Sequence, residues 1–234
     1  MIFRQLFEPE SSTYTYLLGC PQTGAAVLID PVLETAERDL EAVRDLGLTL
    51  AWTVETHVHA DHVTAAARLR SLSGCKVAFP AGEEIAGADA YLSELEPLAA
   101  GAIALKPLYT PGHTDHHHCY LAGGRVFTGD ALLIDGCGRT DFQGGCAATL
   151  YRSVRDKIFT LPDETSVYPG HDYRGRDVSS IGRERASNPR LGGGRTEKEF
   201  VAIMAALELP YPRKIDVAVP ANRRCGALPE TGRG

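Results

Sequence analysis

Residues 57–62 read His-Val-His-Ala-Asp-His and place four metal-binding side chains within one short stretch. In an extended segment alternate residues point the same way, so His57, His59 and Asp61 can face one cavity. We expect His62 to open the following helix and to reach that cavity from another side. Because imidazole and carboxylate groups are ligands of transition metals, this spacing predicts a metal site.

Three further side chains of the same kind follow later in the chain, each just after a predicted strand. They are His113 in Thr-Pro-Gly-His, Asp130 in Thr-Gly-Asp and His171 in Pro-Gly-His. A single histidine is usually an ordinary core or surface residue. Seven candidate ligands with this placement favour one metal centre built from separate loops.

The elements that would position these side chains can be read from the pattern of apolar residues. Strands are predicted at 2–7, 13–18, 25–29, 48–54, 103–109 and 166–168, with a hairpin at 120–128 around two glycines. Helices are predicted at 35–46, from 65 to Gly74 and at 147–158. Four of the strands end beside candidate ligands, as expected where a rigid sheet carries functional loops at one edge.

The last quarter of the chain gives a weaker pattern. Thr196 and Glu199 form a predicted capping box before a short helix, and residues 210–220 look too rich in proline for a helix or a central strand.

We predict a single domain over residues 1–226 and a tail over 227–234. The tail contains Leu-Pro-Glu-Thr-Gly, the motif that sortases cut. Only two residues follow it, which favours a tag or a coincidence over a cell-wall signal.

Composition narrows the class of protein. With 234 residues, 44% of them hydrophobic and 23% charged, the chain can bury one sizeable core. Its net charge of −6 disfavours a nucleic-acid or anionic-membrane partner. No export signal or long apolar stretch is found, so we expect a cytoplasmic protein. Six widely spaced cysteines predict reduced thiols, and the sequence leaves a homodimer open.

The seven candidate ligands match, in type and order, the motifs of the metallo-β-lactamase superfamily. Within it, several segments resemble the persulfide dioxygenases more specifically. These are Thr-Gly-Asp-Ala-Leu-Leu-Ile at 128–134, Gly-Cys-Gly-Arg-Thr-Asp-Phe-Gln at 136–143, His-Asp-Tyr at 171–173, Asn-Pro-Arg-Leu at 188–191 and Val-Pro-Ala-Asn at 219–222. The resemblance implies an α/β fold, the metallo-β-lactamase-like αββα sandwich, with metal at one edge of two packed sheets.

The resemblance also implies one Fe(II) per chain, bound by His57, His113 and Asp130. Two imidazoles and one carboxylate leave three positions open on an octahedral iron, which agrees with this assignment. The implied reaction oxidises glutathione persulfide, or a similar small persulfide, with O2 and water to sulfite and free thiol. The remaining candidates would orient ligands or substrate; they are His59, Asp61, His62 and His171. Since the ligands of a two-metal site are also present, the alternative is a glyoxalase II-type hydrolase of glutathione thioesters.

Two residues near the ligands are predicted to hold the thiol carrier. The guanidinium of Arg139 suits a substrate carboxylate, although an internal ion pair with Asp141 is the alternative. Tyr173 lies two residues past a candidate ligand, so its loop can reach the open side of the metal.

Other polar residues nearby are expected to be structural. His116, His117 and His118 extend the run of imidazoles, and a satisfied or exposed strand face is favoured over further ligands. If they form a strand, the first and third face one way and the second the other. Cys137 is interpreted as a reduced structural thiol rather than a redox group.

Overall fold

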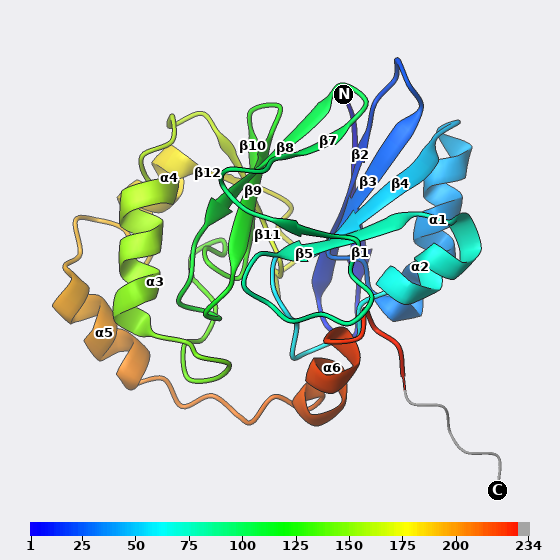
Figure 1. The fold of residues 1–234 in the computed structure, drawn as a ribbon. Helices are drawn as coiled ribbons and strands as arrows, with labels where there is room; N and C mark the ends of the chain where they lie inside the picture. The colour runs from blue at the N-terminus through cyan, green and yellow to red at the C-terminus, as the bar shows by residue number, and fades with distance from the viewer. Residues whose placement is uncertain (229–234) are drawn as a thin grey trace, which may run out of the picture.

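The computed structural model describes residues 1–228 and consists of two six-stranded sheets packed face to face (Figure 1). The first sheet has the order β1-β2-β3-β4-β5-β6, formed by Ile2–Glu8, Thr13–Gly19, Ala25–Ile29, Thr49–Val54, Lys76–Pro80 and Ala90–Leu92. The second has the order β12-β11-β10-β9-β8-β7, formed by Ser179–Ser180, Ser166–Pro169, Arg125–Gly129, His118–Ala122, Ile103–Tyr109 and Leu98–Ala100. Most of the sortase-like motif, in the predicted tail, lies outside the described residues.

Helices cover the outer face of each sheet (Figure 1). Those on the first sheet are α1 (Ala36–Asp45) and α2 (Ala66–Ser73). The second sheet carries α3 (Ala147–Ser153), which continues into a π-helical turn at Val154–Ile158, together with α4 (Ile181–Ser187) and α5 (Glu197–Ala205). This arrangement confirms the predicted αββα sandwich. Within residues 1–228 no helix is both long and apolar enough to cross a bilayer.

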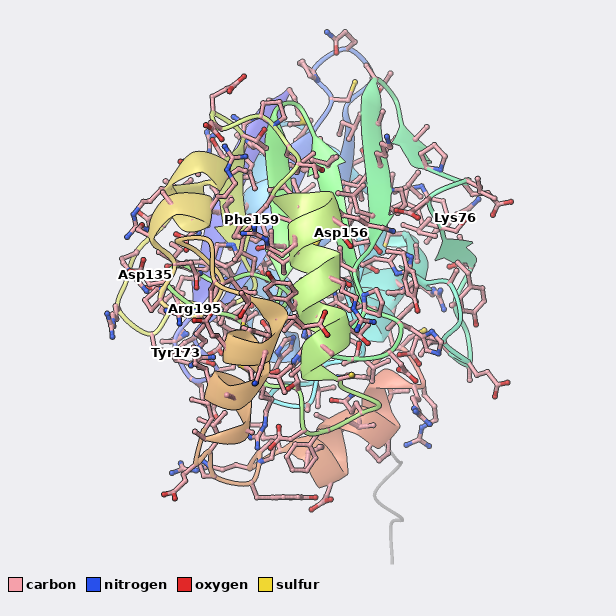
Figure 2. The ribbon with its side chains drawn as sticks, turned by 90° about the vertical axis from the view of Figure 1, so that its left-hand side faces the viewer. Lys76, Asp135, Asp156, Phe159, Tyr173 and Arg195 are labelled. Atoms are coloured by element: carbon pink, nitrogen blue, oxygen red, sulfur yellow. The ribbon has the colours of Figure 1, made fainter. Side chains whose placement is uncertain are left out.

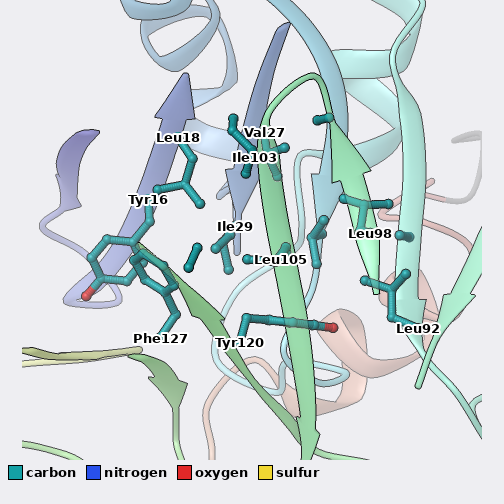
Figure 3. Packing of buried hydrophobic residues seen from close by; sticks show 14 of the residues in the cluster. Tyr16, Leu18, Val27, Ile29, Leu92, Leu98, Ile103, Leu105, Tyr120 and Phe127 are labelled. Atoms are coloured by element: carbon teal, nitrogen blue, oxygen red, sulfur yellow. The ribbon is translucent and has the colours of Figure 1, made fainter. Parts of the chain in front are cut away.

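Side chains from both sheets fill the space between them (Figure 3). Tyr16 and Ile29 from the first sheet share one buried cluster with Leu105, Tyr120 and Phe127 from the second. Burying one such side chain contributes roughly 1.5–3 kcal/mol, so the cluster holds the two sheets together. The shared core supports a single domain over residues 1–226, which stays a prediction.

The predicted strand-to-ligand connections are found at one end of the sandwich. Strands β8, β10 and β11 run in the same direction, because β9 lies antiparallel between the first two and β11 pairs parallel with β10. Their carboxyl ends therefore meet at one edge of the sheet, and His113, Asp130 and His171 follow directly in the loops there. Strand β4 of the other sheet leads into the loop that carries His57.

The hairpin between β9 and β10 turns where the sequence predicts. Gly123 and Gly124 form its two-residue loop with φ of 54° and 75°. Two successive left-handed residues are the requirement of the type I′ turn, which glycine meets without a steric penalty. The predicted capping box also forms, since Thr196 and Glu199 each bond the other's main-chain N–H at the start of α5.

The prediction for residues 210–220 is wrong, because Ile215–Asn222 form helix α6 with Pro220 inside it. Proline in a helix interior costs about 3 kcal/mol through its missing N–H and its ring. Burial of Ala218 and Ala221 against Val63 offsets this cost, as does hydrogen bonding by Asn222. Tertiary contacts therefore override the local preference.

The position expected for His62 is also wrong. Helix α2 begins only at Ala66, so His62 lies in the irregular loop after β4. An isolated bridge between Val32 and Thr64 occupies the intervening residues. The helix therefore begins where the apolar pattern predicts it, and only the expectation that His62 opens the helix fails.

All six cysteines are unpaired, as the sequence predicts. Cys137 is 3% exposed and contacts Met204, and burial raises its pKa to about 11. Such a thiol is unreactive near neutral pH, which agrees with a structural role. Cys146 is exposed.

Candidate metal centre

Three of the predicted ligands converge at the open edge of the sandwich. His57, His113 and Asp130 each offer one ligand atom, and these atoms lie within 4.8 Å of one another. The Nε2 atom of His113 is 3.5 Å from an Asp130 carboxylate oxygen, and the rings of the two histidines are nearly perpendicular, 4.8 Å apart. These distances suit three side chains that share one metal ion.

Hydrogen bonds on the far side of both imidazoles fix which nitrogen faces the centre. The Thr56 hydroxyl donates to Asp30, so it accepts from Nδ1 of His57 at 2.9 Å. Nδ1 of His113 donates to the main-chain oxygen of Arg139 at 2.7 Å. Each ring therefore carries its proton on Nδ1 and leaves the Nε2 lone pair for a metal, the usual arrangement of a ligating histidine.

Asp30, which directly follows β3, accepts the hydrogen bonds that hold Thr56 and His59 in place. Its carboxylate accepts from the main-chain N–H and hydroxyl of Thr56 and from Nε2 of His59 at 3.1 Å. Burial alone would lower the pKa of His59, but Asp30 and Glu55 raise that pKa well above its usual value. By contrast, burial holds the pKa of His57 well below its usual value.

The other four candidates surround the first three. His59, Asp61 and His62 form a second group whose ligand atoms lie within 4.8 Å of one another, and His62 Nδ1 is 2.9 Å from Asp61. Nε2 of His171 lies 3.6 Å from a carboxylate oxygen of Asp61 and 3.6 Å from one of Asp130. The structure thus brings all seven predicted residues together.

Several buried atoms of this cluster have no hydrogen-bond partner among residues 1–228. They include Nδ1 of His59, Nε2 of His62 and Oδ1 of Asp130. Leaving a buried polar atom unpaired costs about 1–3 kcal/mol, so unpaired atoms gathered at one place indicate a site that binds something. Their chemistry, imidazole nitrogen and carboxylate oxygen, fits a transition-metal ion.

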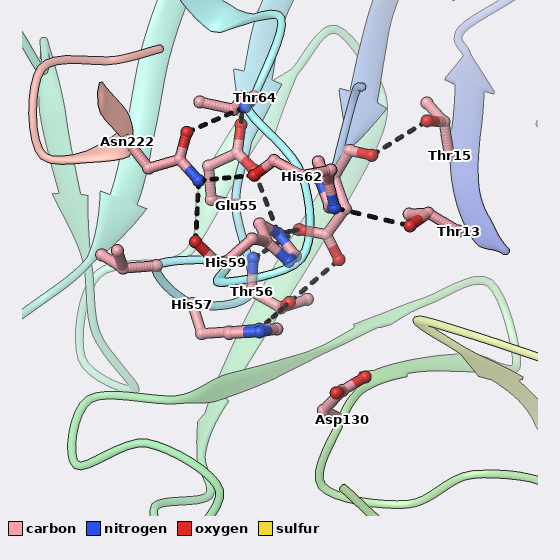
Figure 4. Close-up of polar contacts among 12 residues, drawn as sticks. Thr13, Thr15, Glu55, Thr56, His57, His59, His62, Thr64, Asp130 and Asn222 are labelled. Carbon is pink, nitrogen blue, oxygen red and sulfur yellow. Dashed lines mark hydrogen bonds and ion pairs between the residues drawn. The ribbon is translucent and has the colours of Figure 1, made fainter. Parts of the chain in front are cut away.

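The loop that carries the histidines is locked by Asn222 at the end of α6 (Figure 4). The Asn222 amide donates to the main-chain oxygens of His59 and His62 and accepts from the N–H of Thr64, each at 2.9 Å. The Thr64 hydroxyl in turn donates to the buried carboxyl of Glu55.

Sequence reasoning missed four of these supporting residues: Asp30, Glu55, Thr56 and Asn222. Only Asn222 carried a signal, because it ends the family-specific segment Val-Pro-Ala-Asn. Asp30 and Glu55 each follow a strand directly, but a single carboxylate at a strand end is too common to single out.

A cavity of about 680 Å³ opens onto the cluster. His113, Asp130 and His171 lie in its wall, and so do Arg139 and Tyr173, the residues predicted to hold the carrier. The segment 209–214 between α5 and α6 lines another side. Apolar side chains and charged side chains of both signs share the wall, as expected for a cavity that binds a small organic molecule.

Tyr173 and Arg139 differ in how free their side chains are. Tyr173 is 72% exposed, projects at the surface (Figure 2) and stacks on His171 with ring centroids 6.0 Å apart. Arg139 forms two hydrogen bonds with Asp141, at 2.6 and 2.7 Å, and a third with the main-chain oxygen of Pro210. The internal ion pair left open by the sequence therefore forms.

The three consecutive histidines do not continue a strand. Strand β9 begins at His118, so the expected alternation of faces does not extend back to His116. His117 and His118 are both buried and hydrogen-bonded, whereas His116 lies beside Asp115. The hydrogen bonds of His117 and His118 therefore agree with the expectation that these side chains are structural.

Comparison with known proteins agrees with this geometry. Residues 9–171 match the metallo-beta-lactamase superfamily. The mitochondrial persulfide dioxygenase ETHE1 of Homo sapiens is 50% identical over 99% of this chain and 91% of its own length. The crystal structure of ETHE1 from Myxococcus xanthus superposes with a TM-score of 0.94, at 53% identity, over 97% of this chain and all of that one.

The hydrolase alternative has a more distant counterpart. Hydroxyacylglutathione hydrolase from a Polaromonas species is 36% identical over 68% of this chain and 62% of its own length. The dioxygenase relatives match more residues over more of the chain. The chain therefore belongs to the metallo-β-lactamase superfamily and, within it, to the persulfide dioxygenases.

Proposed function

We propose that this enzyme is an iron(II)-dependent dioxygenase that oxidises glutathione persulfide or a similar low-molecular-weight persulfide. The persulfide, O2 and water yield sulfite and the free thiol, so the terminal sulfur receives three oxygen atoms and leaves its carrier. The observation that carries the proposal is the convergence of His57, His113 and Asp130 within 4.8 Å in a persulfide dioxygenase chain.

These three residues would hold one iron per chain. Two neutral imidazoles and one carboxylate are the donor set of non-haem iron(II) oxygenases. When bound, iron(II) supplies open coordination positions and the redox couple that sulfur oxygenation requires; zinc lacks such a couple. The hydrogen bonds from Nδ1 of both histidines keep the ligand nitrogens unprotonated and aimed at the centre.

The remaining polar residues would orient the ligands and the substrate. His59 is held by Asp30, and His62 by Asp61, so neither ring can rotate freely. His171 lies between Asp61 and Asp130 and lines the cavity together with them. Such outer contacts typically change metal affinity or rate by about 10–100-fold.

Tyr173 and Arg139 would hold the thiol carrier in the cavity. The Tyr173 ring offers an exposed surface beside His171 for the carrier to pack against. Arg139 would exchange its Asp141 partner for a carboxylate of the carrier, since both are anions of the same geometry. The cavity wall carries carboxylates as well as cations, and Arg174, Arg190 and Arg213 are the cations that would pair with an anionic carrier such as glutathione.

The test is metal analysis of anaerobically purified protein, together with an oxygen-electrode trace on glutathione persulfide. We expect about one iron per chain and O2 uptake matched by sulfite formation. The control variant His113→Ala should lose both. Two tightly held zinc ions per chain, with cleavage of a glutathione thioester and no O2 uptake, would establish the glyoxalase II-type hydrolase instead.

The compartment and the oligomeric state stay predictions. The sequence favours the cytoplasm, whereas the Homo sapiens relative is named as mitochondrial. Fractionation of the source cells with an antibody to this chain distinguishes the two. Light scattering of the purified protein tests the homodimer.

A further inference from the structure

His117 is buried directly against the proposed metal ligands. Its ring lies 5.2 Å from that of His57, stacked at an interplanar angle of 28°, and meets His113 edge-on at 6.2 Å. Its Nε2 atom accepts the main-chain N–H of Asp130 at 3.2 Å. One histidine therefore neighbours all three ligands without belonging to the ligand set.

Hydrogen bonds on both sides hold His117 in one tautomer. Because Nε2 accepts from Asp130, the proton of the neutral ring is on Nδ1, which donates to the Thr110 hydroxyl at 3.0 Å. The side chain is fully buried. Both ring nitrogens are engaged, so His117 is a support for the ligands and not a further ligand.

The residue before Asp130 shows how closely His117 fits. Gly129 has a left-handed φ of 46°, and a Cβ atom there would lie 2.6 Å from His117 Nε2 and 2.7 Å from the Thr56 hydroxyl. Such contacts are too short for any side chain. The imidazole thus packs against the turn at which the chain leaves β10 and presents the Asp130 carboxylate.

We propose that His117 is a positioning residue that sets the direction of Asp130 relative to His57 and His113. Through its acceptor atom it fixes the main chain of one ligand, and through its ring face it limits the orientation of another. The affinity for the metal and the shape of the coordination sphere would then depend on His117. This inference rests on the proposed ligand set.

Two amide variants separate the two hydrogen bonds. In His117→Asn the amide can replace Nδ1 and keep the Thr110 contact, but it is too short to reach Asp130. In His117→Gln the longer amide can replace Nε2 and accept from Asp130. We expect His117→Asn to weaken metal binding by about 10–100-fold, while His117→Gln stays close to the parent protein.

The neighbouring His118 is a matched control. It is 2% exposed, donates from Nδ1 to the main-chain oxygen of His116 and packs against Tyr109, 5.2 Å away. His118→Asn should therefore leave metal binding unchanged. Affinity is measured for Co(II) by competition with a chelator. The absorption spectrum of the Co(II)-loaded protein is the second readout, because a general loss of stability does not shift it.

We expect a shifted Co(II) spectrum for His117→Asn and parent-like spectra for His117→Gln and His118→Asn. Equal effects of the two His117 variants, or an equal effect of His118→Asn, would overturn the proposal. His57→Ala provides the reference for the ligand set itself. If His57→Ala retains the metal, the proposed ligand set fails; if it loses the metal while His117→Asn does not, only the inference about His117 fails.

Discussion

Nδ1 of His113 donates to the main-chain oxygen of Arg139 at 2.7 Å, so Arg139 supports a proposed metal ligand through its backbone. Its side chain turns away, pairs with Asp141 and bonds the main-chain oxygen of Pro210 at the cavity wall. A change of the Arg139 side chain therefore leaves the contact to His113 available and tests the carrier site separately.

Arg139→Lys should raise KM for glutathione persulfide by about ten-fold and change kcat little. Lysine keeps the charge but loses the planar fork, and one charge-assisted bond contributes roughly 1.5–3 kcal/mol. A group that binds ground state and transition state equally affects KM alone. The measurement is steady-state oxygen consumption, and Tyr173→Phe is assayed beside it.

A small persulfide without the glutathione carboxylates is the control substrate for Arg139→Lys. It should be oxidised almost normally, because no carboxylate is available for the lost fork. Equal losses on both substrates, or a lower kcat at unchanged KM, would show that Arg139 supports the loop around His113 instead of the carrier.

Single alanine substitutions at five of the seven clustered residues should fall into two classes. His57→Ala, His113→Ala and Asp130→Ala each remove a metal bond, so we expect protein without retained iron. His62→Ala or His171→Ala should keep much of the iron and lose rate by about 10–100-fold. The measurement is the iron content of each variant after desalting. Complete loss of iron in both His62→Ala and His171→Ala would contradict a one-metal site.

Asn222→Ala should destabilise the protein by at least about 2 kcal/mol, since buried partners left unpaired cost about 1–3 kcal/mol each. The amide bonds the main chain of His59, His62 and Thr64, all in the loop after β4. Urea unfolding gives the free-energy difference. Val217→Ala, at a position 58% exposed on the same helix, is the control and should change little.

Cys146 should be the first cysteine to react with iodoacetamide. It is exposed, and hydrogen bonding from the Thr149 hydroxyl and main chain lowers the pKa of its thiol. Because the thiolate reacts, labelling should reach its plateau at a lower pH than for an ordinary exposed thiol. Burial raises the pKa of Cys119 to about 12 and slows that residue further.

The labelling of Cys20 tests whether the exposure or the pKa of a thiol controls its reaction with iodoacetamide. The Thr23 hydroxyl lowers its pKa to about 7, yet its side chain is 1% exposed, so access limits its reaction. Mass spectrometry of peptides from the labelled protein locates the modification. Earlier labelling of Cys20 than of Cys146 would show that pKa outweighs exposure here, and Cys146→Ser should remove the fast phase.

The amino-acid sequence predicted the strands, the turns and most of the helices directly, and its resemblance to the persulfide dioxygenases implied the sandwich and the proposed ligands. Strands, glycine turns and a capping box are local features. The spacing of apolar residues, the residues of a turn and the capping residues of a helix each involve only a few neighbouring positions. The family motifs added the donor types, so His57, His113 and Asp130 could be named before their convergence was seen.

Only the tertiary structure decided how those ligands are held. Asn222 bonds the main chain of His59 across 163 positions, and no local pattern reports a contact at that separation. Helix α6 forms around Pro220 because burial and these bonds outweigh its intrinsic cost. In the sequence His117 is only one of three consecutive imidazoles. Its contacts with His57, His113 and the main chain of Asp130 form only when separate loops pack together, and no local pattern predicts them.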